Sequence, residues 1–123
     1  MRTVRRGFTL VELIVVIVVI GIIAAIAIAR FVSVKEAVYI ATMKSDLRNL
    51  AIYEEFYATE NSGNYFAANG TAHGFTPSLS VTITATDDPG PPSTWHATAV
   101  HAKTPKTCSI GGTNPSESMI TCT

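Results

Sequence analysis

The stretch Gly7-Phe8-Thr9-Leu10-Val11-Glu12 opens an apolar run that continues to Ala29. A short leader, residues 1–6, precedes this run and carries three arginines. Within residues 8–29, Glu12 is the only ionisable side chain. Since a membrane-spanning helix needs about 20 mostly apolar residues, the run is long enough to cross a bilayer if Glu12 can be accommodated.

Glu12 is the residue in this run that requires an explanation. A carboxylate inside hydrocarbon is costly, so an ionisable residue in a membrane segment is a functional-site hypothesis by default. Its natural partner is a positive charge at nearly the same depth, and the intact chain offers only the leader arginines nearby. A cut between Gly7 and Phe8 creates such a charge, because Phe8 then carries a free α-amino group.

The segment Arg6-Gly7-Phe8-Thr9-Leu10-Val11-Glu12-Leu13 resembles the processing motif of type IV pilins and of the pseudopilins of secretion and DNA-uptake machines. The likeness continues through Gly21–Ile28, and it covers the first 30 residues closely and the layout of the rest loosely. It implies cleavage between Gly7 and Phe8 by a membrane-embedded prepilin peptidase, N-methylation of Phe8 and assembly into a helical filament. In that family, the residue matching Glu12 pairs with the amino terminus of a neighbouring subunit.

The sequence departs from the family at Ala29, where pilins commonly have proline. Proline removes a helix hydrogen bond and kinks the helix, whereas alanine is the best helix former. We therefore expect a straighter helix in this chain, and local melting at Ala29 on assembly stays an open alternative.

The charge balance bears on partners and orientation. Nine Lys and Arg residues balance nine Asp and Glu residues in the 123-residue chain, and loss of the leader leaves six basic residues and a net charge of −3. That balance argues against specific binding of nucleic acid, which depends largely on phosphate neutralisation. The leader arginines predict a cytoplasmic N-terminus and a C-terminal part outside the inner membrane.

An ordinary secretory signal is the alternative interpretation of the N-terminus. Residues 25–27 and 27–29 each have the small-residue pattern of a signal cleavage site. However, the apolar run exceeds the usual h-region of about 7–15 residues, it contains Glu12, and no turn or proline follows Ala29. These features favour the pilin-type interpretation.

Helical periodicity continues from Arg30 to Glu60, with its cleanest apolar stripe at Ile40, Met43, Leu47, Leu50 and Tyr57. The charged residues fall mainly off this stripe and are expected on a solvated face, where some could meet a neighbouring subunit. Asn61-Ser62-Gly63 is expected to end the helix, with Gly63 as the left-handed cap. Residues 8–60 then form one helix of 53 residues, about 80 Å long.

Four strands are expected after this helix, at residues 78–86, 94–102, 107–110 and 118–122. Alternation gives each of the first two strands one apolar face: Leu79, Val81, Ile83 and Ala85, then Trp95, Ala97, Ala99 and His101. Short polar turns predict an antiparallel meander, and a pilin-like α+β fold results if the helix packs on this sheet. The expected organisation is a leader (1–7), a transmembrane and filament-core helix (8–29) and a globular head (30–123) with helix half 30–60, connector 61–77 and sheet 78–123.

Cys108 and Cys122 are the only cysteines, and they are expected outside the cytoplasm, where disulfides persist. A disulfide that ties the last strand to the one before it is favoured over free thiols or a metal site, because the pair lacks metal-ligand spacing. A closed loop of this size is worth about 3 kcal/mol.

The remaining candidate sites have simpler explanations. His96 and His101 lie five apart and so on opposite faces of one strand, and His73 is isolated. Asp87-Asp88 could ligate Ca²⁺, but a plain turn is favoured because Ca²⁺ takes 6–8 oxygens. Asn69-Gly70-Thr71 fits an N-glycosylation acceptor, a short pattern that often arises by chance. No nucleophile–base pair, phosphate loop, metal set or cofactor motif stands out, so an enzyme is not expected.

The expected function is that of a structural subunit of a type IV pilus-like filament serving motility, adhesion or DNA uptake. Its expected partners are further copies, prepilin peptidase, inner-membrane assembly machinery and the bilayer that holds the single-pass precursor before it enters an extracellular filament. The alternatives are a pseudopilin of a type II secretion system, and a membrane-anchored or secreted binding module.

Overall fold

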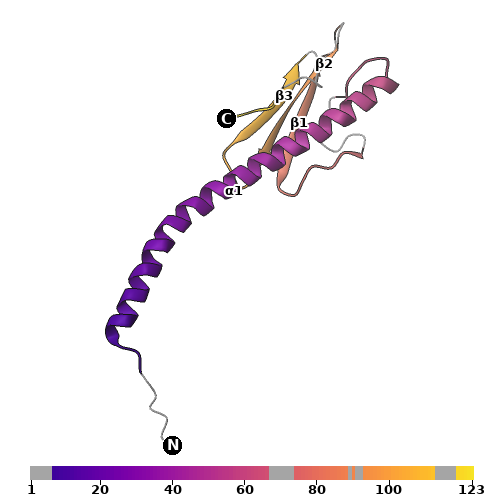
Figure 1. The fold of residues 1–123 in the computed structure, drawn as a ribbon. Coiled ribbons are helices and arrows are strands. Elements are labelled where there is room, and N and C mark those ends of the chain that lie inside the picture. Colours follow the sequence, from indigo (N-terminus) through magenta and orange to yellow (C-terminus); the bar gives the residue numbers. More distant parts are fainter. Residues whose placement is uncertain (1–6, 67–73, 89, 91–92, 113–118) are drawn as a thin grey trace, which may run out of the picture. The chain divides into compact units, whose positions relative to one another are not determined.

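The computed structural model describes residues 7–66, 74–88, 90, 93–112 and 119–123 (Figure 1). The chain divides into two compact units, Met1–Lys35 and Glu36–Thr123. The elements follow one another as helix α1 and then strands β1 to β4. The Asn69-Gly70-Thr71 acceptor and His73 lie outside the described residues.

Helix α1 runs from Leu10 to Glu60 and passes through Ala29 without interruption. It begins two residues later than the sequence predicted, because Thr9 occupies the capping position in front of it. Its C-terminus confirms the expected stop: the Gly63 N–H donates to the Ala58 carbonyl over 2.8 Å. Gly63 has φ 83° and Ser62 has φ 58°, so two successive residues adopt the left-handed conformation that ends a helix.

In the first unit, every described residue from Gly7 to Lys35 is exposed. Large apolar side chains therefore face outward all around this part of α1, and even Ile14, among the least exposed of them, shows 47 % of its surface. By length and composition, α1 is the one helix in the described residues that could cross a membrane. A helix that is apolar all round needs lipid or other protein around it.

In the second unit, the four strands form one antiparallel sheet in the order β1-β2-β3-β4. Their bounds are Val81–Asp88, Thr94–His101, Thr107–Gly112 and Thr121–Cys122. Residues 36–60 of α1 pack against this sheet (Figure 1). The expected meander and the α+β class are both confirmed.

One hydrophobic core joins the helix to the sheet. Met43, Leu47 and Leu50 of the expected stripe are buried in it, while Ile40 and Tyr57 are only half-buried. The sheet contributes the inward residues of its first three strands together with Phe75 from the connector: Val81, Ile83, Ala85, Trp95, Ala97, Ala99, Cys108 and Ile110.

The first strand is shifted relative to its predicted bounds. Ser78–Ser80 form a turn in which the Val81 N–H donates to the Ser78 carbonyl over 3.0 Å and Ser80 has φ 67°. Leu79 is therefore 93 % exposed, and the prediction that it faces the core was wrong. At the other end the ladder continues through Asp87 and Asp88, which the sequence assigned to a turn.

The prediction that charges lie off the buried stripe was wrong for two carboxylates. Asp46 and Glu54 are 4 % and 1 % exposed. Asp46 accepts hydrogen bonds from the N–H and the hydroxyl of Ser78 over 2.9 and 2.8 Å. Glu54 accepts one from the Phe66 N–H over 2.8 Å. Both carboxylates thus fasten the segment between α1 and β1 to the helix, which compensates for their burial.

Candidate assembly site at the helix N-terminus

Thr9 and Glu12 form a reciprocal cap at the start of α1. The Thr9 N–H and the Thr9 hydroxyl donate to Glu12 Oε2 over 2.9 and 2.8 Å. In return, the Glu12 N–H donates to Thr9 Oγ1 over 3.2 Å. This is the capping-box arrangement. Each residue's side chain accepts the backbone N–H of the other, and both N–H groups would otherwise have no partner at the start of the helix.

The cap was missed at the sequence level, although its signal was present. Thr9-Leu10-Val11-Glu12 fits the pattern of Ser or Thr followed three residues later by Glu or Gln. Reading Glu12 only as a charge in an apolar run concealed its backbone role. The hydrogen bonds from Thr9 hold the Glu12 carboxylate back over the first turn, beside the segment that precedes the helix.

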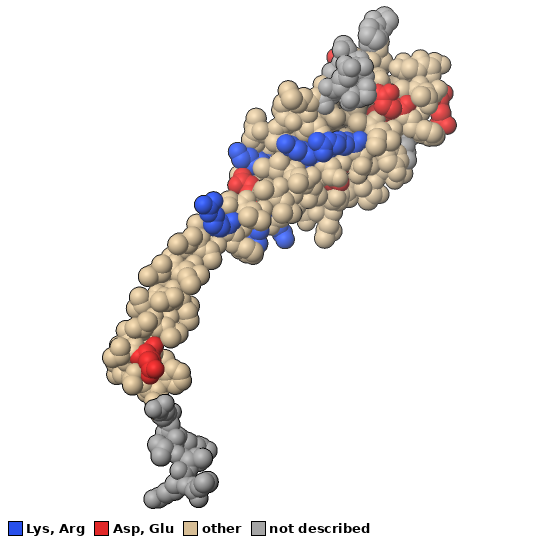
Figure 2. All heavy atoms as spheres, viewed as in Figure 1, with Lys and Arg blue, Asp and Glu red and all other residues tan. Residues whose placement is uncertain are grey.

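Glu12 has one hydrogen-bond partner among the described residues, and that partner is Thr9. Both bonds end on Oε2, so Oε1 accepts none from the described part of the chain. Figure 2 shows the apolar segment as neutral side chains broken by one acidic group, which the sequence identifies as Glu12. The site therefore presents a negative charge with a spare acceptor on an otherwise apolar surface.

The peptide bond between Gly7 and Phe8 lies in front of the helix. Gly7 is exposed, Phe8 is 86 % exposed, and neither is part of a helix or strand. A Cβ added at Gly7 meets no atom of the chain within 4 Å. The bond is thus open to a protease, and the chain's own fold does not require glycine there.

The family model described as the prokaryotic N-terminal methylation motif matches residues 2–28. The chain carries the type IV pilin and pseudopilin signature. The matched residues include Gly7, Phe8 and Glu12, and they end just before Ala29. This pilin signature and the long apolar helix fit a membrane-anchored precursor. No curated protein and no solved structure gives a significant match to the chain.

Beyond the pilin signature, the predicted disulfide is confirmed. Cys108 and Cys122 are bonded and face each other across β3 and β4 with their Cα atoms 4.1 Å apart. Thr107 and Thr123 exchange both backbone hydrogen bonds over 3.0 Å. The neighbouring cysteine pair is therefore a non-hydrogen-bonded pair, the kind in which the two strands approach most closely.

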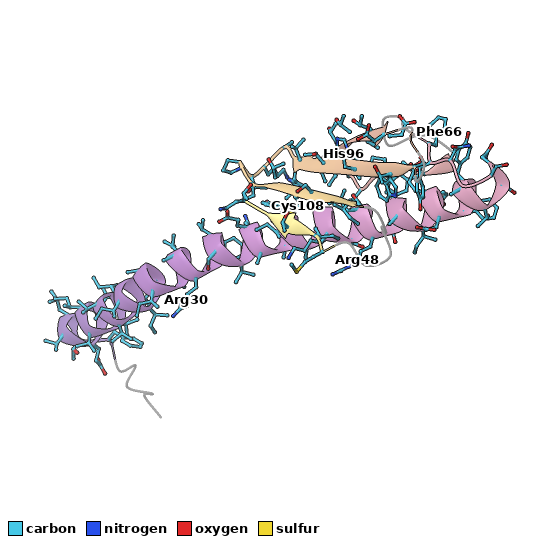
Figure 3. All side chains as sticks on the ribbon, turned by 90° about the horizontal axis from the view of Figure 1, so that it is seen from above. Arg30, Arg48, Phe66, His96 and Cys108 are labelled. Carbon is cyan, nitrogen blue, oxygen red and sulfur yellow. A yellow bond between two sulfur atoms is a disulfide. The ribbon has the colours of Figure 1, made fainter. Side chains whose placement is uncertain are left out.

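The other candidate residues are not brought together. His96 and His101 lie on opposite faces of β2 as predicted: His96 is exposed and labelled in Figure 3, whereas His101 is 8 % exposed. The His101 ring stacks on Tyr39 with centroids 4.4 Å apart, and its Nδ1 accepts the Lys103 N–H over 3.1 Å. Within the described residues, no group of three His, Cys, Asp or Glu side chains could hold a metal ion.

Proposed function

We propose that this chain is a structural subunit of a type IV pilus-like filament, cleaved after Gly7 and N-methylated at Phe8. The observation that carries the proposal is the combination of the methylation motif with a helix whose first part is apolar and wholly exposed. Lipid covers that surface in the inner-membrane precursor. Other copies of the same helix cover it in the extracellular filament.

Cleavage supplies the positive charge that the apolar segment lacks. The new α-amino group of Phe8 forms in front of the helix cap. On assembly, the amine of one copy approaches the Glu12 carboxylate of its neighbour and binds the oxygen that Thr9 leaves free. Because charges attract more strongly in a low-dielectric interior, and because a lone buried carboxylate is costly, this pair selects one axial register of the helices.

The exposed apolar surface is not confined to the first unit. On the head portion of α1, Ile52 and Phe56 are 68 % and 62 % exposed, and they lie four residues apart on one helix face. Large exposed apolar surface on a protein marks an interaction site. Helix packing between copies is therefore expected to extend beyond the membrane-spanning part.

A pseudopilin of a type II secretion system is the second candidate, because pseudopilins carry the same signature as pilins. The small head and its short turns favour a subunit repeated along a filament that serves motility, adhesion or DNA uptake. Both candidates predict the same partners in processing and export, namely prepilin peptidase and inner-membrane assembly machinery.

Mass spectrometry of the mature N-terminus tests the proposal. In a host with prepilin peptidase, the chain is expected to begin with N-methyl-Phe8, and electron microscopy is expected to show filaments. A terminus near Arg30, or an uncut chain, contradicts the proposal and favours a secreted or anchored binding module.

A further inference from the structure

Charged side chains gather at two opposite ends of the head. The basic end has the two lysines of the β2–β3 turn, Lys103 and Lys106, while Lys44 and Arg48 lie along the middle of the head part of α1. The acidic end has four carboxylates near the end of α1 and on the last residues of β1: Glu55, Glu60, Asp87 and Asp88. Figure 2 shows acidic groups at this end of the head and a further acidic group beside basic side chains near the other end.

Strand β2 runs alongside α1, and its two ends lie near the basic side chains and near the acidic side chains respectively. At one end of the strand, the His101 ring stacks on Tyr39, near the beginning of the head helix. At the other end, Trp95 lies near Tyr65, with ring centroids 6.4 Å apart, and the Tyr65 hydroxyl donates to Glu55 over 3.4 Å. The β2–β3 turn therefore lies at the basic end, while the last residues of β1 and the first residues of β2 lie at the acidic end.

These charges are not paired with one another within the described part of the chain. No Lys or Arg nitrogen approaches an Asp or Glu oxygen within 4.0 Å among the described residues. Tyr39, beside the β2–β3 end, and Glu55 are sixteen residues apart on α1, which is about 24 Å of helix and well beyond the screening length of about 8 Å in physiological salt. The two ends therefore differ in the sign of their net charge.

We propose that, in the filament, the acidic end of one head docks on the basic end of a second copy. This docking rests on the proposed filament function. A second copy is the expected partner because every copy carries one acidic end and one basic end, and these two ends are complementary in charge. Nucleic acid or an anionic lipid surface would engage the basic end and leave the acidic end without a partner.

The charges set the orientation of the heads more than the strength of the filament. Exposed ion pairs contribute only about 0–1 kcal/mol each, whereas complementary charge steers encounter and fixes register. The apolar helices hold the copies together, and the charged ends allow one head-to-head alignment along the filament.

Zero-length carbodiimide cross-linking of filaments of the full chain tests the docking. It joins carboxylates to lysine amines that are in contact, and mass spectrometry identifies the pairs. Glu60 or Asp88 coupled to Lys103 or Lys106 is the expected result, because one copy cannot span that separation. Filaments that give no such cross-link overturn the docking. The docking is also overturned if no cross-link between copies forms and added DNA or anionic vesicles protect the lysines of the basic end.

Charge reversal provides the matched test. The Glu60→Lys and Asp88→Lys pair is expected to lower filament yield about tenfold, as the loss of a few ion pairs predicts, and adding Lys103→Glu and Lys106→Glu to the same chain is expected to restore it. Thr84→Lys, which adds a charge to an exposed position in the middle of β1, away from both ends, is the control and leaves yield unchanged.

The two proposals fail in different ways. If the unaltered chain gives a mature Phe8 terminus but no filaments, the filament function fails, and the docking fails with it. If the unaltered chain forms filaments while the reversed and restored chains assemble equally well, only the docking fails.

Discussion

The Thr9 hydroxyl lies 2.8 Å from Glu12 Oε2, while Thr9 Oγ1 accepts the Glu12 N–H over 3.2 Å. Glu12 thus serves the backbone of its own helix as well as carrying a negative charge. The two roles can be separated by experiment, because a neutral side chain of the same shape can still accept a hydrogen bond.

Glu12→Gln separates capping from charge pairing. Glutamine can fill the same place in a capping box, so the start of α1 is expected to persist and cleavage after Gly7 is expected to proceed. Assembly is expected to fail in this variant and in Glu12→Ala, because neither side chain attracts the Phe8 ammonium of a neighbour. N-terminal mass spectrometry and filament yield are the two readouts. Normal filaments from Glu12→Gln would show that the cap, and not the charge, matters.

Thr9→Ala is expected to loosen the first turn of α1. It removes the hydroxyl that bonds to Glu12, so amide hydrogen exchange at Glu12 and Leu13, whose N–H groups both bond to Thr9, should quicken by about tenfold, in line with the loss of a helix cap. The measurement uses the full chain in detergent micelles. Thr9→Ser retains the hydroxyl and is the control, and equal exchange in both variants argues against the cap.

Gly7→Leu is expected to block processing and leave the fold unchanged. A Cβ at Gly7 meets nothing in the chain within 4 Å, so any loss of cleavage arises at the peptidase. Gly21→Leu is the matched control, because Gly21 is equally open but lies away from the bond that is cut. A trimmed Phe8 terminus in Gly7→Leu, seen by mass spectrometry, would refute the role of Gly7.

Glu54→Gln is expected to change how the stability of the head depends on pH. Burial raises the pKa of Glu54 above its usual value of 4.5, the Phe66 N–H acts in the opposite direction, and nearby Asp87 adds to the rise. The folded state therefore binds the proton more tightly than the unfolded state. The stability from this proton is present below the unfolded pKa and is lost as pH rises through the folded pKa.

Glutamine at this position has no proton to lose and can still accept the Phe66 N–H. The melting temperature of Glu54→Gln relative to the unaltered chain should therefore rise between pH 4.5 and neutrality, as measured by circular dichroism. Glu55→Gln is the control next to it on the helix. A difference that stays constant across this range contradicts the assignment.

Reduction of the Cys108–Cys122 disulfide is expected to destabilise the head. Closure of a loop with a separation of 14 residues is worth about 3 kcal/mol, which corresponds to a fall in melting temperature on the order of 15 °C for a domain of this size. A variant with both cysteines replaced by alanine should be insensitive to reductant. An unaltered chain that melts at the same temperature with and without reductant contradicts this value.

Much of the fold follows from patterns that are local in the sequence. The buried face of β2, from Trp95 to His101, follows from simple alternation. The pairing of Cys108 with Cys122 follows from their being the only two cysteines. The end of α1 follows from Gly63, because that position takes the left-handed conformation which other residues adopt at a cost.

The predictions that were wrong share one physical cause. In each case a hydrogen bond joins residues that the hydrophobic periodicity considers one at a time. Asp46 and Glu54 lie on the buried face because Ser78 and Phe66, from the segment between α1 and β1, donate hydrogen bonds to them. Leu79 faces solvent because the turn at Ser78–Ser80 changes the direction of the chain just before β1. At the candidate assembly site, the sequence indicates the charge of Glu12, while its hydrogen bonds to Thr9 were not predicted.

A filament density map at side-chain resolution tests the central claim most directly, through the distance from the Glu12 carboxylate to the nearest α-amine. We expect the nitrogen of a methylated Phe8 from an adjacent copy to lie within hydrogen-bonding distance, about 2.7–2.9 Å for a charged pair. A Glu12 side chain that faces lipid or solvent, with no amine from any copy in reach, would contradict the account.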